Sequence, residues 1–122
     1  MSSDIALGQL GSGYLDDAGA LTPPAGKVVV AVTCIQDTSF TLLTQELPTD
    51  ATFKGPQTSA GVAETNSFGT TANIAASNGA NSDAVATSDV FPKGITLYGR
   101  WKAVTLNTST TATSQVVVYY GY

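Results

Sequence analysis

The chain contains no histidine, and this absence limits the chemistry that its side chains could perform. Without histidine there can be no Ser-His-Asp triad and no Cys-His pair, and the commonest metal ligand is missing. The single cysteine, Cys34, lies in an alternating apolar run, which predicts a small core residue rather than a reactive thiol. A lone cysteine also excludes an internal disulfide. The sequence therefore predicts a protein that is not an enzyme.

The acidic side chains offer no better site. Asp16 and Asp17 lie in a segment expected to be a loop, where solvated carboxylates are the ordinary case. Asn78, Asn81 and Asp83 resemble a loose set of oxygen ligands for Ca²⁺, but without the spacing of an EF-hand loop. No Gly-rich phosphate-binding motif with its lysine is present. We therefore expect no catalytic residues, no metal site and no cofactor.

Charge is scarce along the whole chain. Charged residues make up 11% of the sequence and the formal net charge is -4, whereas charged residues make up about 25% of typical soluble domains. The few basic residues form no stripe, so nucleic acid is not an expected partner. The longest apolar run, residues 28–32, is far too short for a membrane span, and the first ten residues lack the pattern of a signal peptide. Such a composition suits close contact with another protein, or a coat-type domain with a Thr/Ser surface.

The side chains best suited to binding are concentrated in residues 91–122, which hold the only tryptophan and four of the five tyrosines. Two aromatic, β-branched runs joined by a Thr/Ser-rich connection predict an antiparallel hairpin there. Tyrosine and arginine are the types enriched at interface hot spots. The alternative is an ordinary half-buried sheet face. The candidate interface residues of this hairpin are Tyr98, Arg100, Lys102, Tyr119, Tyr120 and Tyr122.

A second candidate binding element is the N-terminal arm, residues 1–26, in which apolar side chains are scattered among glycines without a period. Such a segment usually needs a groove or an edge on another structure to bury its side chains. We expect residues 1–20 to be mobile in the free protein and ordered on a partner, with Asp16 and Asp17 facing basic residues of that partner. The alternative is a disordered terminus. Its candidate interface residues are Ile5, Leu7, Leu10, Tyr14 and Leu15.

The remaining sequence, residues 27–122, predicts one domain that is all-β: an antiparallel β-sandwich, or a Greek-key or jelly-roll-like barrel, with an extended N-terminal arm. Four runs have the alternation of strands, at residues 27–35, 38–44, 94–106 and 114–121. The side chains that alternation places in the core are Val30, Val32, Phe40, Leu42, Ile95, Leu97 and Trp101.

Turn chemistry marks where two of these strands begin. Pro24-Ala25-Gly26 and Pro92-Lys93-Gly94 each lead into a strand, and proline second with glycine fourth predicts a type I turn. This echo suggests two similar hairpin halves. Between the halves, residues 55–90 are rich in Gly, Ser, Thr, Ala and Asn. They form either a mobile excursion or short edge strands at residues 70–75 and 83–87.

Two motifs carry a resemblance to a known family. ALTPPAG at residues 20–26 leads into a valine-rich strand, and PKGITLYGRW at residues 92–101 is followed by the aromatic end YYGY. This arrangement resembles small virion proteins of tailed phages, particularly those that infect cyanobacteria and other aquatic bacteria, over the first third and last quarter of the chain. The resemblance implies a capsid decoration, or cement, protein. Such a protein is β-rich and often trimeric, and it carries no catalytic residues.

The resemblance also implies where the protein acts. It would be made in the cytoplasm of the bacterial host and would bind the outside of the major capsid lattice, holding neighbouring capsomers together against DNA pressure. The major capsid protein and further copies of the chain, most simply in a homotrimer, are then its expected partners. The alternative is a tail-associated or receptor-binding β module that recognises host glycans, because exposed tyrosine and tryptophan also form sugar platforms. Copy number per virion separates the two.

Overall fold

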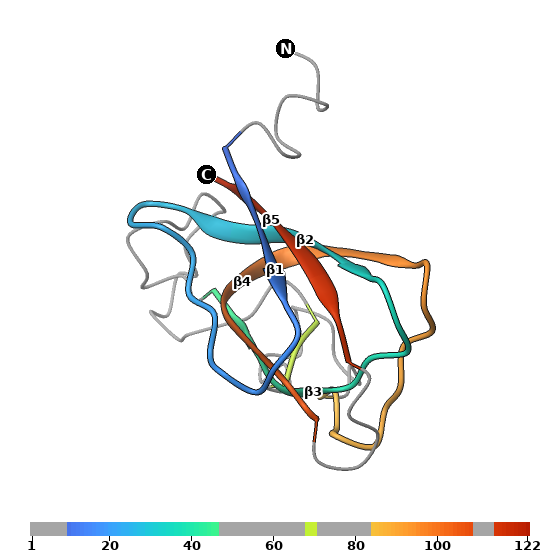
Figure 1. The fold of residues 1–122 in the computed structure, drawn as a ribbon. Helices are drawn as coiled ribbons and strands as arrows, with labels where there is room; N and C mark the ends of the chain where they lie inside the picture. Colours follow the sequence, from blue (N-terminus) through green and yellow to red (C-terminus); the bar gives the residue numbers. More distant parts are fainter. Residues whose placement is uncertain (1–9, 47–67, 71–83, 109–113) are drawn as a thin grey trace, which may run out of the picture.

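The computed structural model describes residues 10–46, 68–70, 84–108 and 114–122. These residues form a single antiparallel sheet, which confirms the expected all-β class of sandwich or barrel-like fold (Figure 1). Within the described ranges there is no helix, and hence none long and apolar enough to cross a membrane. The sheet has the order β1-β5-β2-β4-β3. Its strands are β1 (Ser12–Leu15), β2 (Val28–Cys34), β3 (Phe40–Gln45), β4 (Thr96–Leu106) and β5 (Val116–Gly121).

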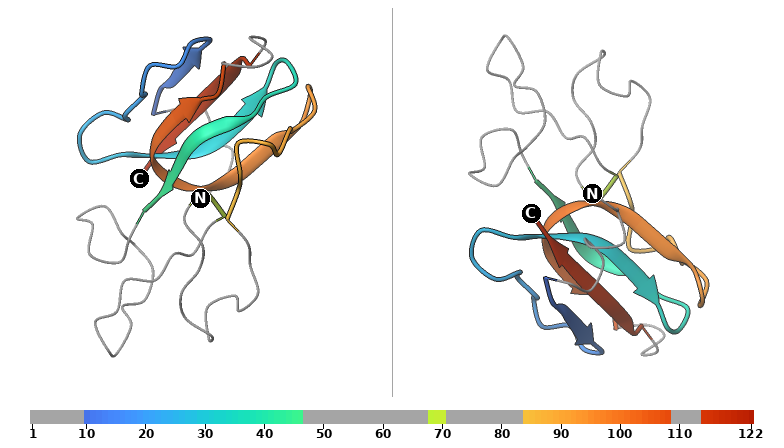
Figure 2. Two further views of the ribbon diagram at one scale, coloured as in Figure 1. Left: turned by 90° about the horizontal axis from the view of Figure 1, so that it is seen from below. Right: turned by 90° about the horizontal axis from the view of Figure 1, so that it is seen from above.

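The sheet is strongly curved, and the long strand β4 pairs with two different strands along its length. Residues 96–101 of β4 pair with β2, and residues 101–106 pair with β3. On the other side of this second half, Leu21 forms a bridge with Val104, with backbone hydrogen bonds of 2.8 and 3.0 Å. The chain that leaves β1 therefore reaches β4 at Leu21, and the sheet curls toward a barrel (Figure 2).

Of the three irregularities in strand pairing, at Val30, at Thr41 and between Thr44 and Gln45, the first two change which predicted side chains face the core. The register shifts at Val30 in β2 and at Thr41 in β3. Each extra residue moves the following side chains to the opposite face of the strand. The prediction that Val30 and Leu42 belong to the core was therefore wrong: Val30 is half-buried and Leu42 is 47% exposed. Val29 and Leu43 take their places, both fully buried.

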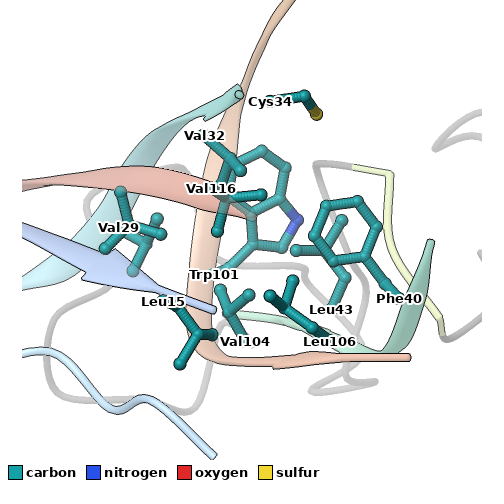
Figure 3. Packing of buried hydrophobic residues seen from close by; sticks show 11 residues of the cluster. Leu15, Val29, Val32, Cys34, Phe40, Leu43, Trp101, Val104, Leu106 and Val116 are labelled. Atoms are coloured by element: carbon teal, nitrogen blue, oxygen red, sulfur yellow. The ribbon is translucent and has the colours of Figure 1, made fainter. Parts of the chain in front are cut away.

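The core itself fills the inside of the curved sheet (Figure 3). Trp101 is fully buried, its ring meets Phe68 edge-on at 5.4 Å, and its indole Nε1 donates to the Phe68 carbonyl at 2.7 Å. These contacts confirm the predicted core position of the tryptophan. The other predicted members are found either in the cluster, as Val32 and Phe40, or packed against it and partly buried, as Ile95 and Leu97. The cluster consists of Leu15, Val29, Val32, Cys34, Phe40, Leu43, Trp101, Val104, Leu106, Val116 and Val118.

The two proline turns lead into β2 and β4 as expected, but the two hairpin halves that they suggested do not form. In the sheet, β4 lies between β2 and β3, and β2 lies between β4 and β5. The geometry of the turns also differs from the prediction. The Lys27 amide donates to the Pro24 carbonyl at 3.0 Å, and Gly26 has a φ of 79°. Glycine with positive φ at the third position defines a type II turn, not type I. Gly94, with a φ of 93°, has the same place after Pro92. Glycine is needed in both turns because other residues rarely adopt this conformation.

Within residues 55–90, the described segment 68–70 lies beside β3, and the Val85 amide donates to the Gly69 carbonyl at 2.7 Å. The Thr70 amide donates to the Leu43 carbonyl at 3.0 Å, and the Leu43 amide donates to Thr70 Oγ1 at 3.1 Å, so this segment covers the outer edge of β3. The rest of the strand expected at residues 70–75 lies outside the described residues. The strand expected at residues 83–87 is absent over residues 84–87. A turn stands there instead, in which Asp89 Oδ2 accepts from the Ala86 amide at 2.8 Å.

The N-terminal arm also differs from its prediction. Residues 12–15 form β1, which pairs with β5 along its whole length, and Leu15 belongs to the core cluster. We expected residues 1–20 to be mobile in the free protein, whereas residues 12–15 belong to the sheet. The inward-facing ring of Tyr120 lies beside Gly11 and Gly13, where an added Cβ would come within 3.3 and 2.6 Å of it. Over these residues the glycines make room for an aromatic ring, which offsets the entropy they lose on ordering.

Candidate protein-interaction surface

The strand pairing places tyrosines in a row across the face of the sheet opposite the core. Ala31 of β2 pairs with Tyr98 of β4 on one side and with Tyr119 of β5 on the other, and Tyr119 pairs in turn with Ser12 of β1. Directly paired residues of an antiparallel sheet point to the same face. Because Val32, the next residue of β2, lies in the core, this row faces outward.

A second row runs parallel to the first. Tyr14 of β1 pairs with Val117 of β5, Val117 pairs with Thr33 of β2, and Thr33 pairs with Thr96 of β4. The two threonine hydroxyls share a hydrogen bond of 2.9 Å. We call the surface formed by these two rows the tyrosine face. Its members are Ser12, Tyr14, Ala31, Thr33, Thr96, Tyr98, Val117 and Tyr119.

The tyrosine face is aromatic and uncharged. Tyr98 is 63% exposed and Tyr14 is 56% exposed, while Tyr119 is half-buried. Ala31, between Tyr98 and Tyr119, is fully buried although it does not belong to the core cluster. None of the residues that form this face carries a charge. A surface with rigid phenol rings around small side chains is typical of the central part of a protein interface, where charge is depleted.

Arg100, a predicted interface residue, has an internal role at the end of this surface. Its guanidinium forms a two-pronged ion pair with Glu46, with Nε–Oε1 at 2.6 Å and Nη2–Oε2 at 3.2 Å, and Nη1 donates to the Tyr122 carbonyl at 2.7 Å. The Glu46 side chain is 1% exposed and that of Arg100 is 30% exposed. Arg100 therefore ties the end of β3 and the last described residue to β4. Sequence reasoning missed Glu46 because it lies 54 positions away.

The hairpin predicted over residues 91–122 was wrong, because β2 lies between β4 and β5 in the sheet and the two strands do not pair. The remaining candidate residues of this segment lie in different surroundings. Tyr120 points to the inner side of the sheet, where it packs against the core cluster, so it is not part of the tyrosine face. Lys102 is half-buried. Tyr122 lies beyond β5 and is 62% exposed. The tyrosine face thus brings together Tyr98 and Tyr119 from this group, but not Tyr120.

The predicted interface residues of the N-terminal arm also lie in different surroundings. Tyr14 lies on the tyrosine face, whereas Leu15 points into the core. Leu10 is half-buried, and its carbonyl accepts from Lys27 Nζ at 3.2 Å. Ile5 and Leu7 lie outside the described residues. The signal that could have joined Tyr14 to the sheet is the short alternation Ser12-Gly13-Tyr14-Leu15, which has the period of a strand but sits among glycines.

The described residues do not gather reactive groups at any point. Among them there is no group of three or more His, Cys, Asp or Glu side chains that could hold a metal ion. The Cys34 thiol is buried in the core cluster. Burial raises the pKa of this thiol, against a smaller opposing effect of its hydrogen bond with Thr38. The thiol is thus protonated at neutral pH, in the surroundings of a packing residue.

Comparison with known proteins identified no relative of this chain. No family model, no curated protein and no solved structure matches the chain.

Proposed function

We propose that this protein is a non-enzymatic structural protein of a phage virion, a capsid decoration protein that binds the outside of the major capsid lattice and stabilises the head. The observation that carries the proposal is the tyrosine face, on which Tyr14, Tyr98 and Tyr119 lie in two adjacent rows without any charge. The protein would be made in the host cytoplasm and act on the exterior of the virion, with the major capsid protein as its partner.

The physical argument concerns the cost of binding. A tyrosine side chain buries much apolar area while its hydroxyl remains able to form a hydrogen bond. Here the rings are fixed to hydrogen-bonded strands of one sheet, so little conformational freedom is lost when a partner covers them. Because no charge has to be stripped of water, most of the apolar area contributes to affinity. Such a surface suits permanent attachment.

The assignment to a phage virion rests on the resemblance carried by residues 20–26 and 92–101. These segments lead into β2 and β4, which are neighbours in the sheet and both contribute to the tyrosine face. The motifs that carry the resemblance are thus the ones that set up the proposed binding surface. The 92–101 motif also contains Thr96 and Tyr98 of the tyrosine face, which supports a role of this motif in attachment.

The attachment can be tested by mixing the purified protein with capsids that lack it and measuring the bound fraction by co-sedimentation. The Y14S/Y98S double variant changes two exposed side chains of the tyrosine face. We expect it to bind at least about tenfold more weakly, since truncation of interface tyrosines typically costs more than about 1 kcal/mol each. Leu42→Ser is the matched control, because Leu42 is exposed on β3, outside the tyrosine face. Equal binding by the double variant and the wild type would contradict the proposal.

A second candidate function is that of a tail-associated module that binds host glycans. The observation that favours it is the same pair of exposed rings, Tyr14 and Tyr98, because aromatic rings also stack on sugars. The two functions differ in abundance. A decoration protein should be present in amounts comparable to the major capsid protein, whereas a tail module should be present in a few copies. A denaturing gel of purified virions, normalised to the major capsid band, distinguishes them.

A further inference from the structure

Strand β1 leaves an open edge on the sheet. The Gly11 carbonyl accepts from the Tyr120 amide at 3.0 Å, so the backbone groups of Gly11 point toward β5. Backbone groups alternate in direction along an antiparallel strand. Gly13 and Leu15 therefore also point toward β5, whereas the N–H and C=O groups of Ser12 and Tyr14 point away from it. β1 lies at the outside of the sheet in both views of Figure 2, and in the described part of the chain nothing pairs with this side.

Apart from its short length of four residues, this edge has none of the usual protections of an edge strand within the described part of the chain. Proteins normally shield such strands with lysine, proline, a bulge or a covering segment. The other edge of this sheet, β3, is covered in this way by Thr70. In contrast, β1 contains only Ser12, Gly13, Tyr14 and Leu15, and its pairing with β5 has no bulge. An uncharged and regular edge that no described residue covers is a template for one more strand.

We propose that this strand is β1 of a second copy of the protein, added antiparallel about a two-fold axis at Gly13. Paired residues of an antiparallel sheet must face the same side, which restricts the register. With Gly13 opposite Gly13 of the second copy, Ser12 lies opposite Tyr14 in both directions. The outward-pointing N–H and C=O groups of Ser12 and Tyr14 then all form hydrogen bonds. The two tyrosine faces become one continuous surface of a shared sheet.

Charge complementarity supports a second copy in this register. The same pairing places Asp16 of one copy opposite Leu10 of the other. Within each copy, Lys27 Nζ donates a hydrogen bond to the Leu10 carbonyl at 3.2 Å, so the ammonium group lies beside Leu10. Asp16 is exposed, and Lys27 has no ion pair in the described part of the chain. Each interface would therefore contain two equivalent contacts between Asp16 and Lys27, and the like charges of the two Asp16 side chains lie at opposite ends.

An open edge that pairs with itself also determines the stoichiometry. Rings of three or more subunits require two different complementary surfaces, whereas a surface that pairs with itself closes as a dimer. Because Thr70 already occupies the outer backbone groups of Leu43 within β3, an added strand could not pair continuously along that edge, and the proposed extension pairs β1 with β1. The inference thus replaces the expected homotrimer by a two-fold dimer. It does not depend on the proposed attachment to capsids, because it is tested on the purified protein alone.

Register-specific cross-linking provides the first test. Directly paired residues on neighbouring strands have Cα atoms about 5.5 Å apart, within the range of a disulfide. We expect a mixture of Ser12→Cys and Tyr14→Cys proteins to form a cross-linked dimer under oxidation, while neither variant alone does. The native Cys34 is buried and serves as the unreactive background. Cross-linking of Tyr14→Cys or Ser12→Cys alone would contradict the register, and no cross-link in the mixture would contradict the pairing.

Sedimentation of the full chain provides the second test. We expect the wild type to be a dimer and Ser12→Pro to weaken it at least about tenfold, since proline removes an outward N–H from each copy. Circular dichroism should show that the variant remains folded, because this N–H has no partner inside the described part of the subunit. We expect D16K to weaken the dimer and D16K/K27D to restore it, with Asp17→Lys as the control of equal charge. A monomeric or trimeric wild type, or a dimer unaffected by Ser12→Pro and by D16K, would overturn the proposal.

Discussion

Trp101 shows how one side chain determines its neighbours. Its ring lies over Gly99, where an added Cβ would come within 2.6 Å of the indole, and its N–H binds the Phe68 carbonyl. The residue two positions before it must therefore be glycine, and a distant segment is held at the core by the same ring. Buried aromatic residues of this kind contribute more to stability than their area alone suggests, because several elements pack against them.

We predict that Trp101→Ala lowers the free energy of unfolding by about 3–5 kcal/mol, through lost burial and an unfilled cavity. Urea unfolding followed by circular dichroism measures this change. Tyr98→Ala is the control, since this ring is 63% exposed and its loss should cost less than about 1 kcal/mol. A wild-type fluorescence spectrum typical of fully hydrated tryptophan would contradict the buried position of Trp101.

Because the Cys34 thiol is buried, the free energy of unfolding should depend on pH in the alkaline range. Burial raises its pKa above the ordinary value of 9.0, so the folded protein holds this proton more tightly than the unfolded chain does. The resulting stabilisation is complete below about pH 9 and is lost as the pH rises through the raised pKa of the folded state. We predict that the stability difference between the wild type and Cys34→Ala narrows above this pH. A difference that stays constant in urea unfolding across the alkaline range would contradict the prediction.

At the scale of the elements, the register shifts at Thr41 and Val30 decide which side chains β3 and β2 bury. In β3 the shift at Thr41 turns Leu43 into the core and leaves Leu42 exposed. In β2 the shift at Val30 lets Val29 share the core with Val32. An extra residue also increases the local twist of a strand, which suits a sheet as curved as this one.

We predict that Leu43→Ala lowers the free energy of unfolding by about 2–4 kcal/mol, whereas Leu42→Ala costs less than about 1 kcal/mol. The two leucines are adjacent and chemically identical, so each serves as the control for the other. Urea unfolding of the two variants side by side makes the comparison. A larger loss for Leu42→Ala would mean that β3 keeps strict alternation.

At the scale of the whole molecule, the N-terminal segment completes the sheet. β1 pairs with β5, Leu15 packs in the core, and Leu21 forms a β-bridge with Val104 of β4. Residues close to one end of the chain thus join strands that come from its middle and its other end. The segment is part of the fold, and its Tyr14 is part of the proposed binding surface.

We predict that a chain truncated to begin at Ala20 loses at least about 3 kcal/mol of stability, because it lacks the Leu15 side chain and the strand that pairs with β5. Leu15→Ala alone should cost about 2–4 kcal/mol, and Tyr14→Ala, which removes an exposed ring, less than about 1 kcal/mol. Thermal and urea unfolding measure all three. A truncated chain as stable as the full chain would show that β1 contributes nothing to the fold.

Local features of this protein could be predicted from the order of its residues. Alternation identified four of the five strands, proline and glycine marked the turns before β2 and β4, and the apolar context of Trp101 and Cys34 placed both in the core. These predictions succeeded because each depends on residues close together in the chain. Composition likewise indicated a surface poor in charge.

The pairing of strands, in contrast, follows from three-dimensional packing alone. Strand pairing places Tyr14, Tyr98 and Tyr119 on one face of the sheet. The same pairing points Tyr120 toward the core, and the packing brings Glu46 next to Arg100. Alternation states which side chains of one strand share a face, but not which strand lies beside it or where a bulge reverses the faces. Those choices depend on packing between residues far apart in sequence, and the tyrosine face and the open edge of β1 both follow from them.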